Sequence, residues 1–283
     1  MARTTAGYGL GDVGTIMSVD DVAREADKLA EEGPKPEELD QLAGGAPLIE
    51  IEGLESGYGK MHILHGFNLR VAAGQSLCLI GPNGAGKSTV LHSIYGFTRI
   101  FGGTIRIGGE DVTRLSPNQK LKDAGIAYIL QDSSVFPDMS VEENLLMGGY
   151  LMDKPAQAKL AAERVFDKYT RLAERRKQPA RVLSGGERRL LEISRALVMD
   201  PKVLLVDEPS IGLEPRFIDM VFEILDDLQH KEGKTIIMVE QNAKKGLEFA
   251  DIGYVLVAGQ LAKAGTGTAL LKDPEVGRLF LGG

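Results

Sequence analysis

Short, almost uninterrupted apolar runs recur along the chain from residue 47 onward. Five of them are "SLCLIG" (76–81), "GIAYIL" (125–130), "VLLVDE" (203–208), "TIIMVE" (235–240) and "YVLVAG" (254–259). Runs of this kind, apolar at successive positions, are typical of strands that are covered on both faces. Between them, apolar residues return at helical spacing over 87–96, 186–198, 217–230 and 243–250. The alternation predicts an α/β protein with a mostly parallel sheet and ligands at the carboxyl ends of its strands.

The first 47 residues have a different character. They carry ten acidic and four basic residues, which accounts for most of the net charge of -7. Ser18 and Asp21 form a possible capping pair, and the apolar residues that follow recur at helical spacing until Gly33. We expect an acidic extension over 1–47 with one short amphipathic helix at about 19–32. The helix is expected either to dock on a partner or to remain a solvated tail.

Composition limits the class of protein. The 283 residues are 43% hydrophobic and 26% charged, as in ordinary globular proteins. No apolar run approaches the 18 or so residues of a membrane span, and the first 20 residues lack the layout of a signal peptide. The single cysteine, Cys78, lies inside an apolar run and is predicted to be a buried, inert thiol. A cytoplasmic protein is therefore expected.

The segment "GPNGAGKST" joins the first apolar run to a helical stretch. It matches the phosphate-loop pattern G-x-x-x-x-G-K-[ST]. Backbone amides and the start of the following helix would direct positive charge at phosphate, Lys87 would reach the β- and γ-phosphates, and Ser88 would bind Mg²⁺. The predicted nucleotide contacts in this loop are Gly81, Pro82, Asn83, Gly84, Ala85, Gly86, Lys87, Ser88 and Thr89.

Two carboxylates, Asp207 and Glu208, end the apolar run "VLLV" at 203–206. Buried carboxylates need a cation or hydrogen-bond donors, because desolvation of an unpaired charge is costly. With a phosphate loop upstream, the pattern predicts Asp207 as a Mg²⁺ ligand and Glu208 as the base that orients or deprotonates an attacking water. A simple helix N-cap after the strand is the alternative interpretation.

Four further segments stand in a recognisable order. They are "SGYGK" with Tyr58, "AYILQDSSVF" with Gln131, "LSGGERR" at 183–189 and "SIGLEP" at 210–215. Together with the two motifs above, they make residues 48–283 resemble the ATPases of ABC transporters. The resemblance implies a P-loop NTPase fold with an antiparallel β edge and a helical subdomain at about 132–182. It also implies ATP and Mg²⁺ as cofactors, Tyr58 as the adenine-stacking residue and Gln131 as a further ligand of the nucleotide and its metal.

The segment "SGGE" contributes the remaining predicted nucleotide contacts, Ser184, Gly185, Gly186 and Glu187. It is a second set of backbone donors at a helix start, and one chain has no need of two sets for one nucleotide. By resemblance, this segment caps the γ-phosphate held by a second ATPase subunit, so that two chains, identical or paralogous, enclose two ATPs head to tail. A capping box between Ser184 and Glu187 is the structural alternative, and it uses the same donors.

The resemblance also implies partners in the membrane. The chain would lie on the inner face of the cell membrane, bound to permease subunits. A periplasmic substrate-binding protein would be an indirect partner, and no nucleic acid is expected. Val135, Phe136 and Met139 are expected to be exposed in the receiving groove. "VEENLLMGG", "MVEQN" and "LFLGG" look like importers of branched-chain amino acids, urea or amides, whereas "GERRLLEISRAL" is closer to lipopolysaccharide export. A soluble, non-transport ABC protein is the third alternative.

The run "TIIMV" ends in Glu240, Gln241 and Asn242. We expect this strand to lie in the same sheet as 76–80 and 203–206, with its end facing the γ-phosphate. Most of the family has a histidine where Gln241 stands. An amide donates and accepts hydrogen bonds but carries no titrating proton, so Gln241 is predicted to position groups in catalysis and not to act as an acid or base. His62, His65 and His92 are predicted to be packing or surface residues.

Overall fold

The computed structural model of the chain describes residues 33–131 and 134–280, which fold around two sheets. The antiparallel sheet has the strand order β2-β1-β4-β5. Its strands are β1 (Pro47–Tyr58), β2 (Met61–Ala72), β4 (Arg99–Ile107) and β5 (Glu110–Asp111). The helix predicted at 19–32 lies outside the described residues.

The second sheet has the order β10-β9-β3-β8-β7-β6. Its strands are β3 (Ser76–Ile80), β6 (Ile126–Ile129), β7 (Val203–Asp207), β8 (Thr235–Val239), β9 (Ile252–Val257) and β10 (Gln260–Thr266). Every neighbouring pair is parallel except β9 and β10. All residues of β3, β7, β8 and β9 are buried, which confirms the interpretation of the apolar runs as strands covered on both faces.

The other regular elements in the described residues are helices. They are α2 (Pro36–Ala43), α3 (Lys87–Tyr95), α4 (Pro117–Lys122), α5 (Val141–Gly148), α6 (Pro155–Lys168), α7 (Thr170–Glu174), α8 (Gly185–Leu197), α9 (Pro215–His230), α10 (Ala243–Phe249), α11 (Gly267–Lys272) and α12 (Pro274–Phe280), with a 3-10 turn η1 (Ala180–Val182). Within the described ranges, no helix is long and apolar enough to cross a membrane.

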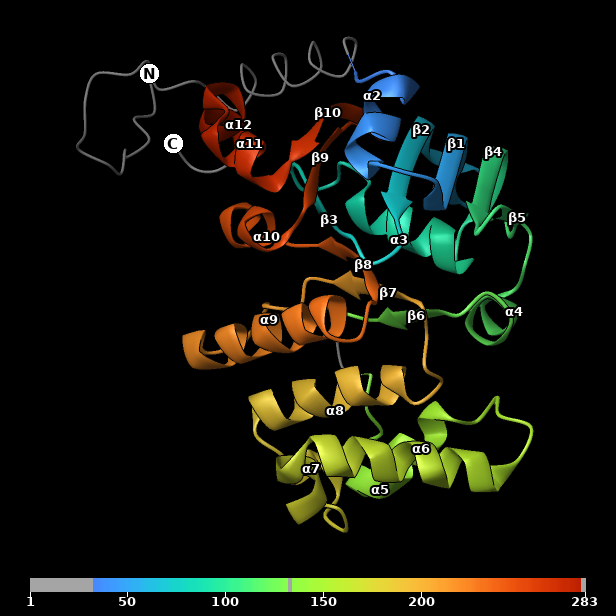
Figure 1. Ribbon diagram of the computed structural model, residues 1–283, viewed down its shortest axis with the longest axis vertical. Coiled ribbons are helices and arrows are strands. Elements are labelled where there is room, and N and C mark those ends of the chain that lie inside the picture. Colours follow the sequence, from blue (N-terminus) through green and yellow to red (C-terminus); the bar gives the residue numbers. More distant parts are fainter. Residues whose placement is uncertain (1–32, 132–133, 281–283) are drawn as a thin grey trace, which may run out of the picture.

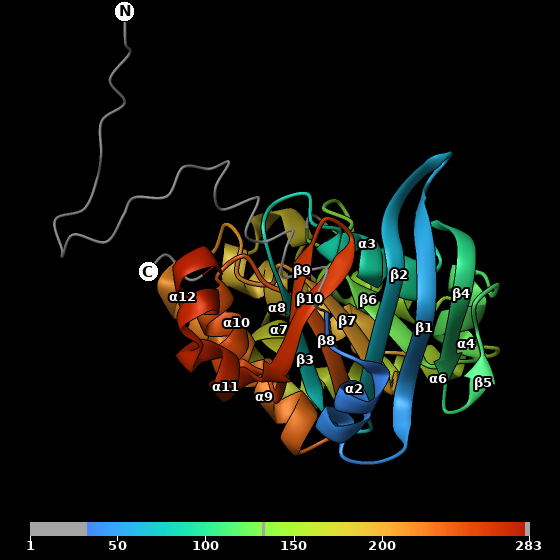
Figure 2. The same cartoon turned by 90° about the horizontal axis from the view of Figure 1, so that it is seen from above.

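Three large clusters of buried apolar side chains form the core of the described residues. One lies between the antiparallel sheet and the parallel sheet around α3, and a second lies on the other face of the parallel sheet under α9 and α10. The third joins α5, α6 and α7 to α8. Figure 1 shows these four helices gathered at the end of the molecule away from β1, β2 and β4. In Figure 2, the antiparallel sheet and helices α10 to α12 stand on opposite sides of β3, β9 and β10.

Helix α2 packs on the body of the fold although it falls within the acidic stretch 1–47. Leu39 is fully buried in the first core, and Asp40 pairs with Arg70 at 3.2 Å. The Gln75 amide donates to the carbonyl of Leu42 at 3.3 Å. This helix was not predicted from the sequence. Its local signals are a proline and glutamates in the first turn and Gly44, which ends the helix in the left-handed conformation at φ 68°.

The parallel register brings the polar strand ends together. Leu79 of β3 pairs with Val239 of β8, and Val239 also pairs with Asp207 of β7. The three strands therefore lie in one sheet, as predicted, and the structure places β8, which precedes Glu240, between β3 and β7. Parallel strands expose these ends at one edge of the sheet, so the site is built there.

Candidate nucleotide-binding site

The predicted phosphate loop runs from β3 directly into α3. Gly81 has φ 145° and Gly86 has φ 97°, conformations that L side chains rarely adopt. A Cβ on Gly81 would lie 2.2 Å from the carbonyl oxygen of Leu256, and one on Gly86 would lie 2.9 Å from a methyl of Leu64. Because neither position has room for a side chain, only glycine permits the tight turn that leads from β3 into the N-terminus of α3. This turn fits the phosphate groups of a nucleotide.

The ammonium of Lys87 folds back over the loop. Its Nζ donates to the carbonyls of Gly81 and Pro82, each at 2.9 Å, and the residue is 8% exposed. Burial lowers the pKa of Lys87, while the carboxylates of Glu208 and Asp207 act in the opposite direction. The cation is thus held between the loop and the acidic pair, where phosphate oxygens would add charge-assisted hydrogen bonds.

Both carboxylate oxygens of Asp207 accept hydrogen bonds from hydroxyl groups. Ser88 Oγ donates to Oδ1 at 3.1 Å, and Tyr128 OH donates to Oδ2 at 2.8 Å. Ser88 and Asp207 were predicted together from sequence, whereas Tyr128 was missed because its only local signal is a polar tip on an apolar strand. A hydroxyl and a carboxylate are oxygen ligands of the type that Mg²⁺ prefers, so this pair fits the metal.

Glu208 lies beside Gln131. The Gln131 amide Nε2 donates to Glu208 Oε2 at 2.9 Å, although the two residues are 77 positions apart. Glu208 has a positive φ of 44°, which is uncommon for a residue with a side chain, and its backbone amide donates to the carbonyl of Val239 at 2.9 Å. The backbone bond holds the unusual conformation, which sets the carboxylate at the end of β7 next to the loop after β6.

The three polar residues after β8 face different neighbours. Glu240 is buried, and its Oε1 accepts from Ser210 Oγ at 2.7 Å and from the Asn242 amide at 2.9 Å. Asn242 caps α10 through a bond from the amide of Lys245 at 3.1 Å. Gln241 is exposed, and its side chain makes no hydrogen bond within the described residues. Of the three, Gln241 is therefore the one available to a ligand.

The segment predicted to cap a second nucleotide begins helix α8. Ser184 and Glu187 form a reciprocal capping box, with the Ser184 amide donating to Glu187 Oε2 at 2.9 Å, so the structural alternative is confirmed. That bond lowers the pKa of Glu187. Gly185 is exposed, while a Cβ on Gly186 would lie 2.1 Å from the ring of Phe217. The backbone amides of Gly185 and Gly186 therefore have no hydrogen-bond acceptor among the described residues.

Tyr58 stands at the end of β1 with its ring 43% exposed. Its hydroxyl bonds to Nδ1 of His92, and the two rings meet edge to face with centroids 6.0 Å apart. His92 also packs against Phe97 and Tyr128, so it is a packing residue, as predicted. Burial lowers the pKa of His92. The exposed ring of Tyr58 offers a stacking surface for a base.

Two of several cavities at the helical end of the molecule lie towards the sheet and towards α9. One of about 300 Å³ lies between the helical end and the sheet, lined by residues including Tyr128, Phe136, Glu192 and Arg195. Phe136 is 43% exposed beneath the guanidinium of Arg195, which lies 5.4 Å from the ring centroid. The expectation that Val135 is exposed is wrong, because Val135 is 8% exposed and packs into the third core.

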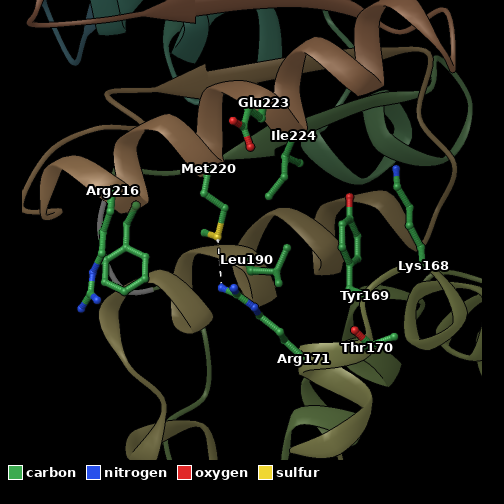
Figure 3. Close-up of a pocket in the computed structure, with 10 residues that line it drawn as sticks. Lys168, Tyr169, Thr170, Arg171, Leu190, Arg216, Met220, Glu223 and Ile224 are labelled. Carbon is green, nitrogen blue, oxygen red and sulfur yellow. Dashed lines mark hydrogen bonds between the residues drawn. The ribbon is translucent and has the colours of Figure 1, made fainter.

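The other cavity, of about 490 Å³, lies between α7, α8 and α9 and contains none of the predicted site residues. Figure 3 shows Arg171 and Met220 facing each other across it, with Arg171 Nη1 4.0 Å from the sulfur. This cavity is therefore separate from the predicted nucleotide site.

Comparison with known proteins decides the family. The model of the family described as "ABC transporter" matches residues 64–211, more than half of the chain. The chain belongs to the ABC transporter family. The ABC ATPase is 41% identical over 236 residues to the high-affinity branched-chain amino acid transport ATP-binding protein BraG of Pseudomonas aeruginosa, covering 83% of this chain and 100% of BraG.

Other relatives of the ABC ATPase lie further away. BraF of the same bacterium is 30% identical and covers 83% of this chain and 98% of BraF. The lipopolysaccharide export ATP-binding protein LptB of Escherichia coli is 32% identical, and the match covers 83% of this chain and 97% of LptB. A crystal structure of a nucleotide-free ATP-binding cassette from an ABC transporter superposes with a TM-score of 0.73 at 27% identity, covering 82% and 98%. These likenesses show an ATP-binding subunit of an ABC transporter, with ATPase activity.

Proposed function

We propose that the edge formed by the phosphate loop and the ends of β6, β7 and β8 is where this subunit hydrolyses ATP. The observation that carries the proposal is the convergence of polar residues from three strand ends: Ser88 bonds to Asp207 at 3.1 Å, Gln131 bonds to Glu208 at 2.9 Å, and Lys87 lies over the phosphate loop. Lys87 and the loop amides bind the phosphates, and Tyr58 stacks on the base. Glu208 accepts the proton of the attacking water, and Gln131 and Gln241 orient it.

Ser88 and Asp207 are the residues that would hold Mg²⁺, with Gln131 as a further ligand. When bound, the ion neutralises negative charge on the phosphate oxygens. Tyr128 keeps the carboxylate of Asp207 turned towards Ser88 by its bond to the other oxygen.

The working unit in this proposal is a pair of ATPase chains. The start of α8 presents the backbone amides of Gly185 and Gly186, which have no hydrogen-bond acceptor among the described residues, whereas the Ser184 amide is bonded to Glu187. In a head-to-tail pair these donors and Glu187 close on the nucleotide of the other chain. BraG and BraF of one bacterium are two different relatives, which supports a heterodimer as an alternative to two identical chains.

Import of branched-chain amino acids is the transport function that the comparisons favour. The identity of 41% extends over the whole of BraG, against 32% for the lipopolysaccharide export relative. In this account, permease subunits bring the ATPase to the inner face of the membrane, and a periplasmic binding protein delivers the solute to them. Pull-down from solubilised membranes, followed by identification of the co-purifying chains, tests the proposal. Permease subunits for amino acids support it, and lipopolysaccharide export partners would contradict it.

The permease is proposed to dock in the groove lined by Phe136, Met147 and Arg195. Phe136 is exposed and aromatic, and it follows Gln131 by five positions in the chain, so a helix seated on it would sense the active site. Phe136→Glu should abolish stimulation of the ATPase by the permease while the isolated subunit stays folded. Retained stimulation would place the docking site elsewhere.

A further inference from the structure

A buried ion pair in α8 lies against the strand ends of the active site. Arg189 and Glu192 are 5% and 6% exposed, and Arg189 Nη1 lies 2.8 Å from Glu192 Oε2. Burying two charges costs more than packing apolar groups of the same size in many proteins. The pair therefore calls for an explanation other than stability.

The same guanidinium reaches two backbone carbonyls on neighbouring strands. Arg189 Nη1 donates to the carbonyl of Leu130 at 2.8 Å, and Nη2 makes a longer contact of 3.5 Å with the carbonyl of Asp207. Leu130 directly precedes Gln131, and Asp207 directly precedes Glu208. The side chains of Gln131 and Glu208 are the pair joined at 2.9 Å. The guanidinium of Arg189 thus contacts the backbone immediately before Gln131 and immediately before Glu208.

We propose that Arg189 is a positioning residue for ATP hydrolysis, which sets the spacing between Gln131 and Glu208 through the carbonyls before them. The guanidinium is a rigid fork, and Glu192 holds it in place, so the ends of β6 and β7 keep a fixed separation. Glu192 also lines the groove proposed for the permease, so the pair of Arg189 and Glu192 connects that groove to the base, Glu208. The inference rests on the proposed role of Glu208.

The test begins with kinetics and ATP binding of three variants in the full-length chain. Arg189→Met should lower kcat about 10- to 100-fold, since misplacement of a catalytic group by about 1 Å can cost about 100-fold. ATP affinity by calorimetry should stay within about threefold, because no phosphate contact is lost. Arg189→Lys should recover part of kcat. If Arg189→Met fails to fold with Glu192 left unpaired, the double variant Arg189→Met/Glu192→Leu removes both charges and should show the same loss of kcat.

Coupling to Gln131 distinguishes positioning from mere support of the fold. In a Gln131→Ala background the Arg189 variants should cost kcat much less, because the contact they position is already absent. Arg176→Met is the matched control, since Arg176 pairs with Glu142 and Glu163 in the helical part and has no bond to a strand end within residues 33–131 and 134–280. It should leave kcat within about twofold.

Three outcomes would overturn the inference. If Glu208→Gln is inactive in the same assay, the base assignment stands. In that case, additive effects of the Arg189 and Gln131 variants, or an unchanged kcat in Arg189→Met/Glu192→Leu, would overturn the positioning role of Arg189 without affecting the proposed function. Normal hydrolysis by Glu208→Gln overturns the base assignment and the inference together.

Discussion

The amide of Gln131 donates a hydrogen bond of 2.9 Å to the carboxylate of Glu208, across the ends of neighbouring parallel strands. The bond joins the loop that enters the helical part of the molecule to the proposed base. In the proposed function, this contact is the connection between the base and the groove proposed for the permease.

Removal of the Lys87 ammonium should abolish nucleotide binding. In Lys87→Ala the loop keeps its amides but loses the cation that lies on the carbonyls of Gly81 and Pro82, and no other cation in the described loop replaces it. Calorimetry with ATP measures the effect directly. Unchanged affinity would mean that the nucleotide binds elsewhere.

Gln241 should act as a hydrogen-bonding sensor of the γ-phosphate. Gln241→His should keep turnover within about tenfold, or roughly 1.4 kcal/mol in barrier. Gln241→Ala should cost more, on the order of 2 to 4 kcal/mol, because phosphate and water lose a positioning contact. Full activity of the Ala variant would show that this strand end is structural only.

The pH dependence of turnover distinguishes a hydrogen-bonding amide at position 241 from a group that titrates there. An amide does not titrate, so the natural enzyme should show no inflection between about pH 6 and 8 that disappears in Gln241→Ala. Gln241→His should introduce one near about 6.5, displaced by the neighbouring phosphate. Kinetics across this range at constant ionic strength provide the measurement.

Helix α2 should contribute to stability, and the residues before it should not. Leu39→Ala removes a fully buried side chain and should lower the free energy of unfolding by about 2 to 5 kcal/mol. Deletion of residues 1–45 should destabilise the protein to a similar or greater extent. Deletion of 1–32 is the matched control and should leave both unfolding and ATP turnover unchanged. Lost turnover in that control would show that the acidic stretch takes part in hydrolysis.

Burial raises the pKa of the Cys78 thiol well above its ordinary value of 9.0, and the carboxylate of Glu240 acts in the same direction. The folded state therefore keeps the thiol proton at a pH where the unfolded chain loses it. This contribution to stability is present below pH 9 and declines above it. Urea unfolding at pH 8 and pH 10 should show a smaller loss in Cys78→Ala than in the natural chain. Rapid alkylation of Cys78 in the native protein would contradict its burial.

Sequence reasoning predicted the strands and the phosphate loop because their signals are local. Successive apolar residues mark β3, β7 and β8, and the glycines at 81 and 86 stand where the backbone admits no side chain. It missed features made by residues far apart in the chain. Leu39 is buried by β-sheet residues that follow it, Tyr128 meets Asp207 across 79 positions, and Val135 is covered by helices.

The central claim is that two chains close around ATP and that Glu208 then drives hydrolysis. Glu208→Gln measures it most directly, because the amide is nearly isosteric with the carboxylate but cannot accept the proton of water. With ATP and Mg²⁺, light scattering after gel filtration should show this variant as a dimer, while the natural chain returns to monomer as ATP is consumed. If the variant stays monomeric with ATP and hydrolyses it at the normal rate, the claim is wrong.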